Sequence, residues 1–448
     1  MSKSELYHRL KNEIDRLPVV DIHEHLAYPE EDYLEISEEY GVDFGRFMFW
    51  YTVDDLLSSG MIIPDLMEFR STLGAVLRVN GKVLSLDEKW NYIKPYWENI
   101  RYTGYSRAVL HSINKLLDID DLNDSTYREV SEKLKALMKP GVYGEMLSKQ
   151  CGFTHIVNDI DTTAQPGAGE RMDRDLLHFV SRFRQFSYVY KPGGIETLEE
   201  KYGRTIRNID HLLDAMDRQF DLWIKDDRRI ALKMADAYLR DLSFEDNTRD
   251  EAERVMRRIF TLRKIPNNDE TLSYAEARPL ENFVMHRILD RAEEHGIPLI
   301  VHTGIQTYMG NEVGNSNATL LTNLFIKYPR LKFHLLHANY PWMHEATCLA
   351  KQFHNVSLDL TWVHIIVPEG AREGLSHQLD TVPVNKIHAF GGDALVPETV
   401  WGALEAAREN TAHVLADKVE TGHMKEEQAV NIAQKMFSEN ARNIFSLE

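Results

Sequence analysis

The chain has 448 residues, of which 43% are hydrophobic, and its formal net charge is −18 at pH 7. So acidic a composition disfavours nucleic acid and anionic membranes as partners, because both select basic protein surfaces. The sequence contains no apolar run of roughly 18 residues, and its first residues lack the apolar core of a signal peptide. We therefore expect a soluble, cytoplasmic protein with a large core and a small-molecule substrate.

The two cysteines, Cys151 and Cys348, are too few and too far apart to indicate a disulfide framework. Neither belongs to a Cys-x-x-Cys pair. We expect both to be small, buried hydrophobic residues.

The first predicted strand, residues 18–25, ends in His23 and His25. Side chains two positions apart in a strand point the same way, so both imidazoles can reach one metal ion. Alone, the pair is a weak signal, because the chain has 19 histidines. Its meaning depends on what the later strands carry.

Residues 27–149 form a long, aromatic-rich region with mostly helical patterning. The region is too long for an ordinary loop. We interpret it as a helical insertion that caps a domain made of residues 1–26 and 150–448. A packing or dimerisation element is the alternative, which leaves a homo-oligomer open.

Three further strands are predicted over residues 153–159, 183–190 and 229–235, with a helix over residues 204–226 before the last of them. The last of these strands carries Lys233. A lysine that points into the interior of a barrel is costly unless it is paired or modified. Lys233 is therefore a candidate site residue.

The next two predicted strands each lead to a histidine. Residues 296–304 form a short apolar strand that carries His302 and is closed by glycine. In the strand over residues 331–337, His337 lies at the C-terminal end, whereas His334 is in the middle and faces the other way. We therefore choose His337 as the candidate.

The last two strands are predicted over residues 355–360 and 386–394. In the second of them Asp393 follows small residues on the same face, which leaves room for a bound ion or substrate. Further helices are predicted over residues 281–295, 398–418 and 425–446.

Eight strands with helical segments between most of them predict an α/β fold, a (β/α)8 TIM barrel rather than an open sheet. The active sites of such barrels are assembled from single side chains at the C-terminal ends of several strands. Five residues fit this pattern: His23, His25, His302, His337 and Asp393.

This pattern resembles the amidohydrolase superfamily, particularly its second, amidohydrolase-related branch. The resemblance rests on His-x-His after strand one, His-Thr-Gly after strand five, His after strand six and Gly-Gly-Asp after strand eight. It implies that His23, His25, His302 and Asp393 hold a divalent metal, usually zinc and sometimes manganese. His337 would be catalytic or contact the substrate in a one-metal site, or bind a second metal in a two-metal site.

By the same resemblance, Lys233 decides the number of metal ions. In two-metal relatives a lysine after strand four is carbamylated and bridges the ions, whereas in one-metal relatives it contacts the substrate. A structural ion pair is the third alternative. We favour one ion, with Lys233 in contact with the substrate.

The expected reaction is hydrolysis of an amide, ester or lactone bond by metal-activated water. Asp393 would take the proton from the attacking water, and His337 and Lys233 would polarise the carbonyl group. The alternative is non-oxidative decarboxylation of a carboxylate-bearing substrate. Minor alternatives are a uronate-isomerase-like enzyme, suggested by the long insertion, and a barrel that binds metal without catalysis.

Further residues near the predicted strand ends are candidates for lining the pocket: Arg240, Tyr238, Tyr340, Trp362 and Gln306. Arg240 is the candidate partner of a substrate carboxylate. The insertion, if it meets its own barrel, would form a lid that excludes water.

Overall fold

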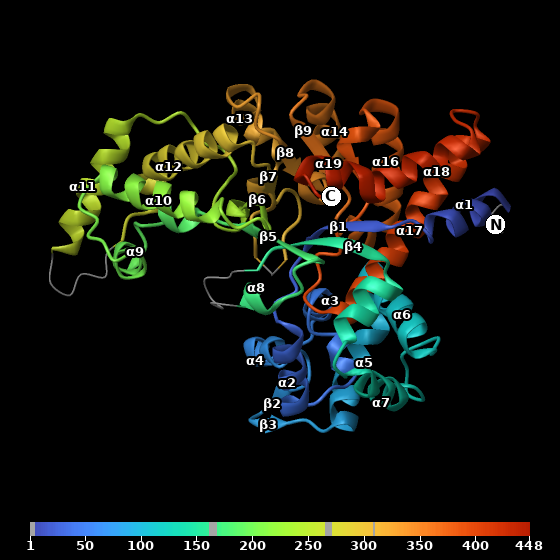
Figure 1. The fold of residues 1–448 in the computed structure, drawn as a ribbon. Coiled ribbons are helices and arrows are strands. Elements are labelled where there is room, and N and C mark those ends of the chain that lie inside the picture. Colours follow the sequence, from blue (N-terminus) through green and yellow to red (C-terminus); the bar gives the residue numbers. More distant parts are fainter. Residues whose placement is uncertain (1–4, 161–167, 265–270, 308–309) are drawn as a thin grey trace.

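The computed structural model describes residues 5–160, 168–264, 271–307 and 310–448 (Figure 1). Within these ranges, eight parallel strands form one sheet in the order β1-β4-β5-β6-β7-β8-β9-β10. Backbone hydrogen bonds from Ile22 to Phe390 (3.4 Å) and from Asp393 to His23 (2.8 Å) join the first and last strands. The predicted α/β fold, a (β/α)8 barrel, is confirmed.

The barrel strands are short and largely buried. They span Val19–Glu24 (β1), Phe153–Asn158 (β4), Leu177–Ser181 (β5), Arg229–Met234 (β6), Leu299–Val301 (β7), Phe333–Leu335 (β8), Val356–Asp359 (β9) and Ile387–His388 (β10). Because parallel strands all run the same way, their C-terminal ends collect at one rim of the barrel. That rim is where the predicted site residues belong.

Helices cover the outside of the sheet. They span Glu5–Ile14 (α1), Ala168–Arg171 (α8), Gly194–Tyr202 (α9), Ile209–Trp223 (α10), Arg249–Arg263 (α11), Tyr274–His295 (α12), Thr322–Lys327 (α13), Met343–Gln352 (α14), Val363–Ile366 (α15), Pro368–Thr381 (α16), Pro397–Glu420 (α17), Glu426–Gln434 (α18) and Asn440–Phe445 (α19). The predicted closing helices correspond to α17 and to α18 and α19, which a π-helical turn joins. The helix predicted over residues 204–226 begins later, at α10.

Helix α12 shows how local sequence sets the limits of an element. Ser273 caps its first turn, and the carboxylate of Glu276 accepts the backbone N–H of Ser273 at 2.9 Å. Gly296 ends the helix with a φ of 66°, a left-handed conformation that glycine adopts without steric cost. The chain then enters β7 and reaches His302.

The strand predicted over residues 183–190 is wrong. The third strand of the sheet is β5, which ends before this segment, and Arg184–Phe186 form a short 3-10 turn. Phe183 and Phe186 are buried three positions apart, and the Phe183 ring lies 5.3 Å from the ring of Phe220 on α10. The aromatic content that suggests a strand instead packs a helical turn against a neighbouring helix.

The two cysteines have different surroundings. Cys151 is buried as expected, whereas Cys348 is exposed, so the expectation of burial is wrong for Cys348. Cys348 lies on α14, which buries its other face against the barrel.

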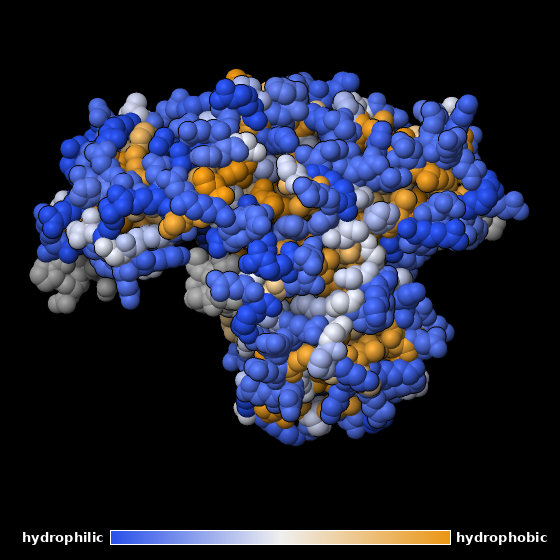
Figure 2. Space-filling view, viewed as in Figure 1, coloured by the Kyte–Doolittle hydropathy of each residue, from blue (hydrophilic) through white to orange (hydrophobic). Residues whose placement is uncertain are grey.

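Figure 2 shows a mainly hydrophilic surface on the face in view, with smaller apolar areas between the helices. No helix in the described ranges is long and apolar enough to cross a bilayer.

The segment between β1 and β4 forms a lobe of helices below the barrel in the view of Figure 1. Its elements are Glu30–Tyr40 (α2), Tyr51–Ser58 (α3), Leu66–Ser71 (α4), Arg78–Val79 (β2), Lys82–Val83 (β3), Leu86–Ile100 (α5), Gly104–Leu117 (α6) and Tyr127–Leu137 (α7). Buried polar side chains of this lobe contact Glu398 on α17. The Tyr33 hydroxyl donates to Glu398, and Arg46 Nη1 lies 3.2 Å from the same carboxylate. Since an unpaired buried charge is strongly destabilising, these contacts fix the lobe against the barrel.

Candidate metal centre and pocket

Three of the predicted metal ligands converge at the C-terminal rim. His25 Nε2 lies 3.1 Å, and His23 Nε2 lies 3.4 Å, from Oδ1 of Asp393. With zinc–ligand bonds of about 2.1 Å, two ligands of one tetrahedral ion stand about 3.4 Å apart. The spacing of these three atoms therefore matches a shared ion.

The hydrogen bonds around these atoms show which of them carry protons. His25 Nδ1 lies 2.8 Å from the backbone oxygen of Asp159. A carbonyl oxygen only accepts, so Nδ1 donates and the Nε2 lone pair of the neutral ring faces Asp393. The Nζ of Lys233 lies 2.9 Å from His23 Nε2 and donates to it. His23 Nε2, His25 Nε2 and Asp393 Oδ1 thus lie close together, and a divalent cation held by these three atoms would replace the Lys233 proton at His23.

His302 and His337 form a second pair beside this centre. His302 Nε2 lies 3.0 Å from the backbone oxygen of Ile305, and His337 Nδ1 lies 3.1 Å from that of Thr361. Both nitrogens donate, so in neutral rings His302 Nδ1 and His337 Nε2, which lie 3.1 Å apart, are both acceptors. His337 Nε2 also lies 3.8 Å from Oδ2 of Asp393. This pair can meet a substrate proton or a second ion, so the one-ion and two-ion alternatives both fit.

Burial is the main cause of the lowered pKa values of His23, His302 and His337. It lowers the pKa of His23 and His302 well below the usual value and also lowers that of His337, although Asp393 opposes the shift in His337. Burial raises the pKa of Asp393, but the contact with His25 and the charges of His337 and Lys233 lower it overall. Neutral imidazoles and an ionised carboxylate are the forms that bind a metal.

Lys233 is paired, as its burial requires. Its Nζ lies 3.6 Å from Oδ2 of Asp159, and Arg182 donates to both oxygens of that carboxylate at 3.1 and 2.6 Å. Burial lowers the pKa of Lys233 to about 8, with Asp159 opposing. Burial raises the pKa of Asp159, but Arg182 and Lys233 outweigh it and hold the value below the usual range. Asp159 directly follows β4, so its strand-end position is the signal that could have identified it.

Strained backbone concentrates at this rim. Of the nine non-glycine residues with positive φ in the described ranges, five belong to the loops after β8, β9 and β10: His337, Ala338, Asn339, Trp362 and Asp393. Such conformations cost roughly 1–2 kcal/mol each and persist where the surrounding contacts hold them.

Asp359, at the end of β9, supplies such contacts. Its Oδ1 accepts the backbone N–H groups of His337 at 2.8 Å and of Thr361 at 3.1 Å. Its Oδ2 accepts from the ring of His334 at 3.0 Å. His334 thus points away from the candidate centre, as its strand parity predicts, and supports the loop that carries His337.

A cavity of about 490 Å³ adjoins the candidate centre. The insertion supplies part of its wall through Trp50 and Tyr51. Trp50 Nε1 donates to the backbone oxygen of Asp393 at 3.2 Å, and the Tyr51 hydroxyl donates to the same oxygen. The Tyr51 ring also stacks on Trp362, with ring centroids 4.7 Å apart. The insertion therefore contacts its own barrel at the site.

Tyr238 lines this cavity, as expected. Its ring lies 4.8 Å from that of His302. The other predicted lining residues are not among the described residues of the wall: Arg240, Tyr340, Trp362 and Gln306. Trp362 lies behind Tyr51 instead.

The expectation that Arg240 binds a substrate carboxylate is wrong. The side chain is buried, with Nη1 2.8 Å from Glu281 and Nη2 2.8 Å from Asn282, both on α12. A 3-10 turn over Asp236–Tyr238 follows β6 and directs the chain outward, so the guanidinium meets α12 rather than the cavity.

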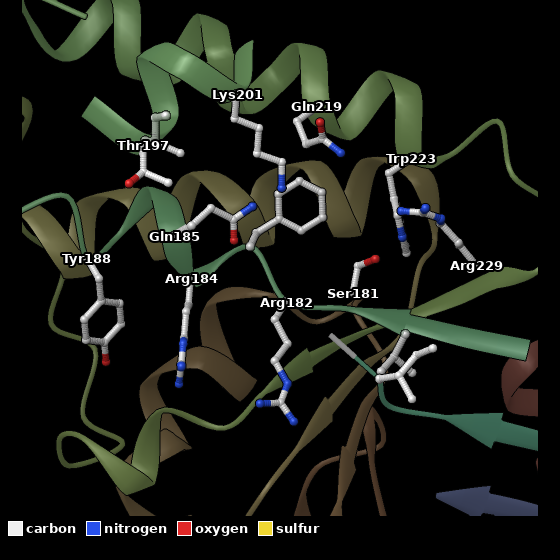
Figure 3. Close-up of a pocket in the computed structure, with 14 residues that line it drawn as sticks. Ser181, Arg182, Arg184, Gln185, Tyr188, Thr197, Lys201, Gln219, Trp223 and Arg229 are labelled. Carbon is white, nitrogen blue, oxygen red and sulfur yellow. The ribbon is translucent and has the colours of Figure 1, made fainter. Parts of the chain in front are cut away.

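Two other arginines, which the sequence motifs do not single out, line the cavity instead. Arg182 and Arg184 both line it, and they also line a neighbouring cavity of about 570 Å³ next to α9 and α10. Figure 3 shows the two guanidinium groups side by side, with Gln185 and Lys201 on the opposite side of the chain. Arg184 forms no ion pair with any described residue and lies 5.8 Å from the ring of Tyr188. The misplaced third strand hid both residues, because its true end lies just before them.

The amidohydrolase family model matches residues 212–447, more than half of the chain. The chain belongs to the amidohydrolase family. Enzymes of this family typically bind a divalent metal, and the donor set described above fits one. The resemblance inferred from the sequence motifs is thereby confirmed.

Individual relatives extend this comparison. Protein fluG of Emericella nidulans is 28% identical over 232 residues, which are 50% of this chain and 26% of fluG. The matched part of this chain thus spans only about a quarter of fluG. Uronate isomerase from Thermotoga maritima has a TM-score of 0.75 at 17% identity, over 99% of this chain and 98% of that one. A candidate metal-dependent hydrolase from Lactobacillus casei has a TM-score of 0.62 at 14% identity, over 98% and 97%. At these identities the likeness shows the fold, which includes the helical lobe.

Proposed function

We propose that this chain is a metal-dependent hydrolase that cleaves an amide, ester or lactone bond in a small molecule bearing a carboxylate. The observation that carries the proposal is the convergence of His23, His25 and Asp393 on one point, with Lys233 beside it. Membership of the amidohydrolase family supports it. In this proposal these three residues hold the ion, for which we propose zinc, and His302 is a further ligand.

The ion, when bound, supplies polarisation of the substrate carbonyl and activation of water. Asp393 accepts a proton from the water that attacks the carbonyl carbon, and delivers it to the leaving nitrogen or oxygen. The ammonium of Lys233 stabilises the charge that develops on the carbonyl oxygen. His337 Nε2, an acceptor in the neutral ring, serves as a proton carrier or as a ligand of a second ion.

In this proposal Arg184, rather than Arg240, binds the substrate carboxylate. Arg184 has no acidic partner among the described residues, and such a guanidinium, beside a cavity that also holds Arg182 and Lys233, favours a substrate carboxylate. Because Asp159 already pairs with Arg182 and Lys233, Arg184 is the candidate for a substrate carboxylate.

Residues 27–149 act as a cap in this proposal. Tyr51 and Trp50, both in this region, donate hydrogen bonds to the backbone oxygen of Asp393. A cap that positions a site residue also excludes water from the reacting centre.

Isomerisation of a sugar acid is the second candidate. It is favoured by the structural likeness to uronate isomerase, which extends over the helical lobe as well as the barrel. The basic cavity also suits a sugar acid. Isomerisation moves hydrogen between adjacent carbons and consumes no water, so product analysis separates it from hydrolysis.

The test is to incubate the metal-loaded enzyme with N-acyl amino acids, lactones, uronates and aromatic carboxylates, and to identify the products by mass spectrometry. Hydrolysis splits or opens the substrate with uptake of water, isomerisation leaves the mass unchanged, and decarboxylation releases CO₂. Turnover of an amide, ester or lactone that is lost in Asp393→Asn supports the proposal. Metal binding without turnover of any class would indicate a non-catalytic barrel and overturn it.

Metal analysis of the purified protein decides the number of ions. One tightly held ion that is lost in His23→Ala supports Lys233 as a substrate contact. Two such ions, with a carbamate on Lys233 in the intact mass, would place His302 and His337 around a second ion.

A further inference from the structure

A second group of side chains of metal-ligating types lies on the outer layer of helices. His344 on α14, and Glu373 and His377 on α16, each place one ligand atom within 4.8 Å of the others. Figure 1 shows α14 and α16 side by side, and the two helices pack against each other. All three side chains are exposed, so an ion in solution can reach them.

The close approach of the two helices has a cause in the sequence. Gly370 and Gly374 lie one turn apart on α16, and both face Met343 on α14. A Cβ atom at Gly374 would lie 3.0 Å from the sulfur of Met343, tighter than ordinary contact allows. The two glycines therefore let α14 approach α16 closely. His344, the next residue after Met343, is thereby brought to the side chains of α16.

The geometry of the three side chains suits a shared ion. One ligand atom from each residue lies within 4.8 Å of the other two, and His344 Nδ1 and His377 Nδ1 lie 3.0 Å apart. The other ring nitrogen of His344, Nε2, lies 3.8 Å from Oε1 of Glu373, so an ion between the two histidines binds Nδ1 of His344 and leaves Nε2 free. Glu373 and His377 are four residues apart on α16, so they share one face of the helix. Two imidazole nitrogens at this separation can share a single proton, or both can direct lone pairs at one metal ion.

We propose that His344, Glu373 and His377 form a second, exposed site for a transition-metal ion of the zinc type, which links α14 to α16. Two imidazoles and one carboxylate select zinc, copper or nickel over magnesium or calcium, which prefer oxygen ligands. Three protein ligands leave at least one position to water, so the site binds more weakly than a closed structural zinc site.

The position of the link gives it a structural role. Helix α14 follows the loop that carries His337, and α16 follows the segment that carries Thr361, whose backbone oxygen accepts from the His337 ring. An ion that joins the two helices stabilises both supports of this histidine. The site does not depend on the proposed reaction, because it shares no residue with the candidate centre.

The experiment uses the full chain with its tightly held metal in place, titrated with Zn²⁺ alone by calorimetry. Wild type and the control His354→Ala, which removes another exposed histidine near α14, should each bind one further Zn²⁺. His344→Ala and His377→Ala should lose this equivalent while they keep the first ion. The further Zn²⁺ should raise the midpoint of thermal unfolding of wild type and leave that of His377→Ala unchanged.

Two results would overturn the inference: wild type that binds no Zn²⁺ beyond its first complement, or His377→Ala that binds as much as wild type. The outcome is separable from that of the proposed function. If the centre at His23 held no ion, wild type and His23→Ala would still each bind one Zn²⁺ that His377→Ala does not.

Discussion

The rim of the barrel and its interior carry the same chemical groups in opposite surroundings. In the interior, His334 has a partner for each ring nitrogen, Ser357 and Asp359, and both oxygens of Asp359 accept hydrogen bonds. At the rim, acceptor atoms of His337 and Asp393 face further acceptors beside a cavity. In this pair, the histidine whose hydrogen bonds are complete supports the fold, whereas the histidine whose acceptor nitrogen faces other acceptors lies where a ligand can bind.

The largest effect is expected at Asp393. Asp393→Asn removes both a ligand and the proton acceptor, so turnover should fall by about 10³-fold or more. The midpoint of thermal unfolding should change little, because the hydrogen bonds from Trp50 and Tyr51 go to the backbone oxygen, which the substitution keeps. Steady-state kinetics and thermal unfolding of the same preparation check this. Near-normal turnover would remove Asp393 from the mechanism.

His334 in β8 and His337 in the loop after it test the contrast between the interior and the rim directly. His337→Ala should lower kcat by about 10²-fold with a small change in the free energy of unfolding. His334→Ala should instead cost about 2–4 kcal/mol of that free energy, because it leaves a cavity and an incompletely paired buried Asp359. Urea unfolding and kinetics on both variants test the ranking. A larger loss of kcat in His334→Ala than in His337→Ala would reverse the assignment.

How much the sequence can predict follows the same division. Strand ends marked by apolar runs were predictable, so the β1, β7, β8 and β10 segments gave His23, His25, His302, His337 and Asp393. Position along the segment separates His337 from His334, because His334 lies in β8 whereas His337 lies in the turn just beyond its C-terminal end, outside the strand predicted for it. The family and the barrel follow from these motifs.

Contacts between distant segments were not predictable. Whether Arg240 points into the cavity or into α12 depends on one 3-10 turn, which has no strong sequence signal. Arg182 and Arg184 were hidden because aromatic residues that pack a turn resemble those of a strand. The link between Tyr51 and Asp393 joins residues that are far apart in sequence, and only the packing of the lobe brings them together.

Arginines provide a third contrast between cavity and interior. Arg184→Gln should raise KM for a carboxylate-bearing substrate by about 10- to 100-fold, the loss of one charge-assisted pair, and leave a neutral analogue unaffected. Arg240→Gln should leave KM unchanged and destabilise the fold by about 3–5 kcal/mol, because it leaves Glu281 buried without its partner. Kinetics with matched acid and amide substrates, together with urea unfolding, distinguish the two. Equal effects of Arg184→Gln on both substrates would exclude a role in carboxylate binding.

The smallest effect is expected where the insertion touches the site. Tyr51→Phe removes one hydrogen bond to the backbone oxygen of Asp393 but keeps the ring that stacks on Trp362, and Trp50 still donates to the same oxygen. A net loss of about 0.5–1.5 kcal/mol corresponds to a two- to tenfold drop in kcat/KM. Tyr33→Phe is the matched control, because its hydroxyl serves a buried carboxylate on α17. It should lower stability and leave kcat/KM unchanged. If Tyr51→Phe behaved like Tyr33→Phe, the lobe would be a packing element rather than part of the active site.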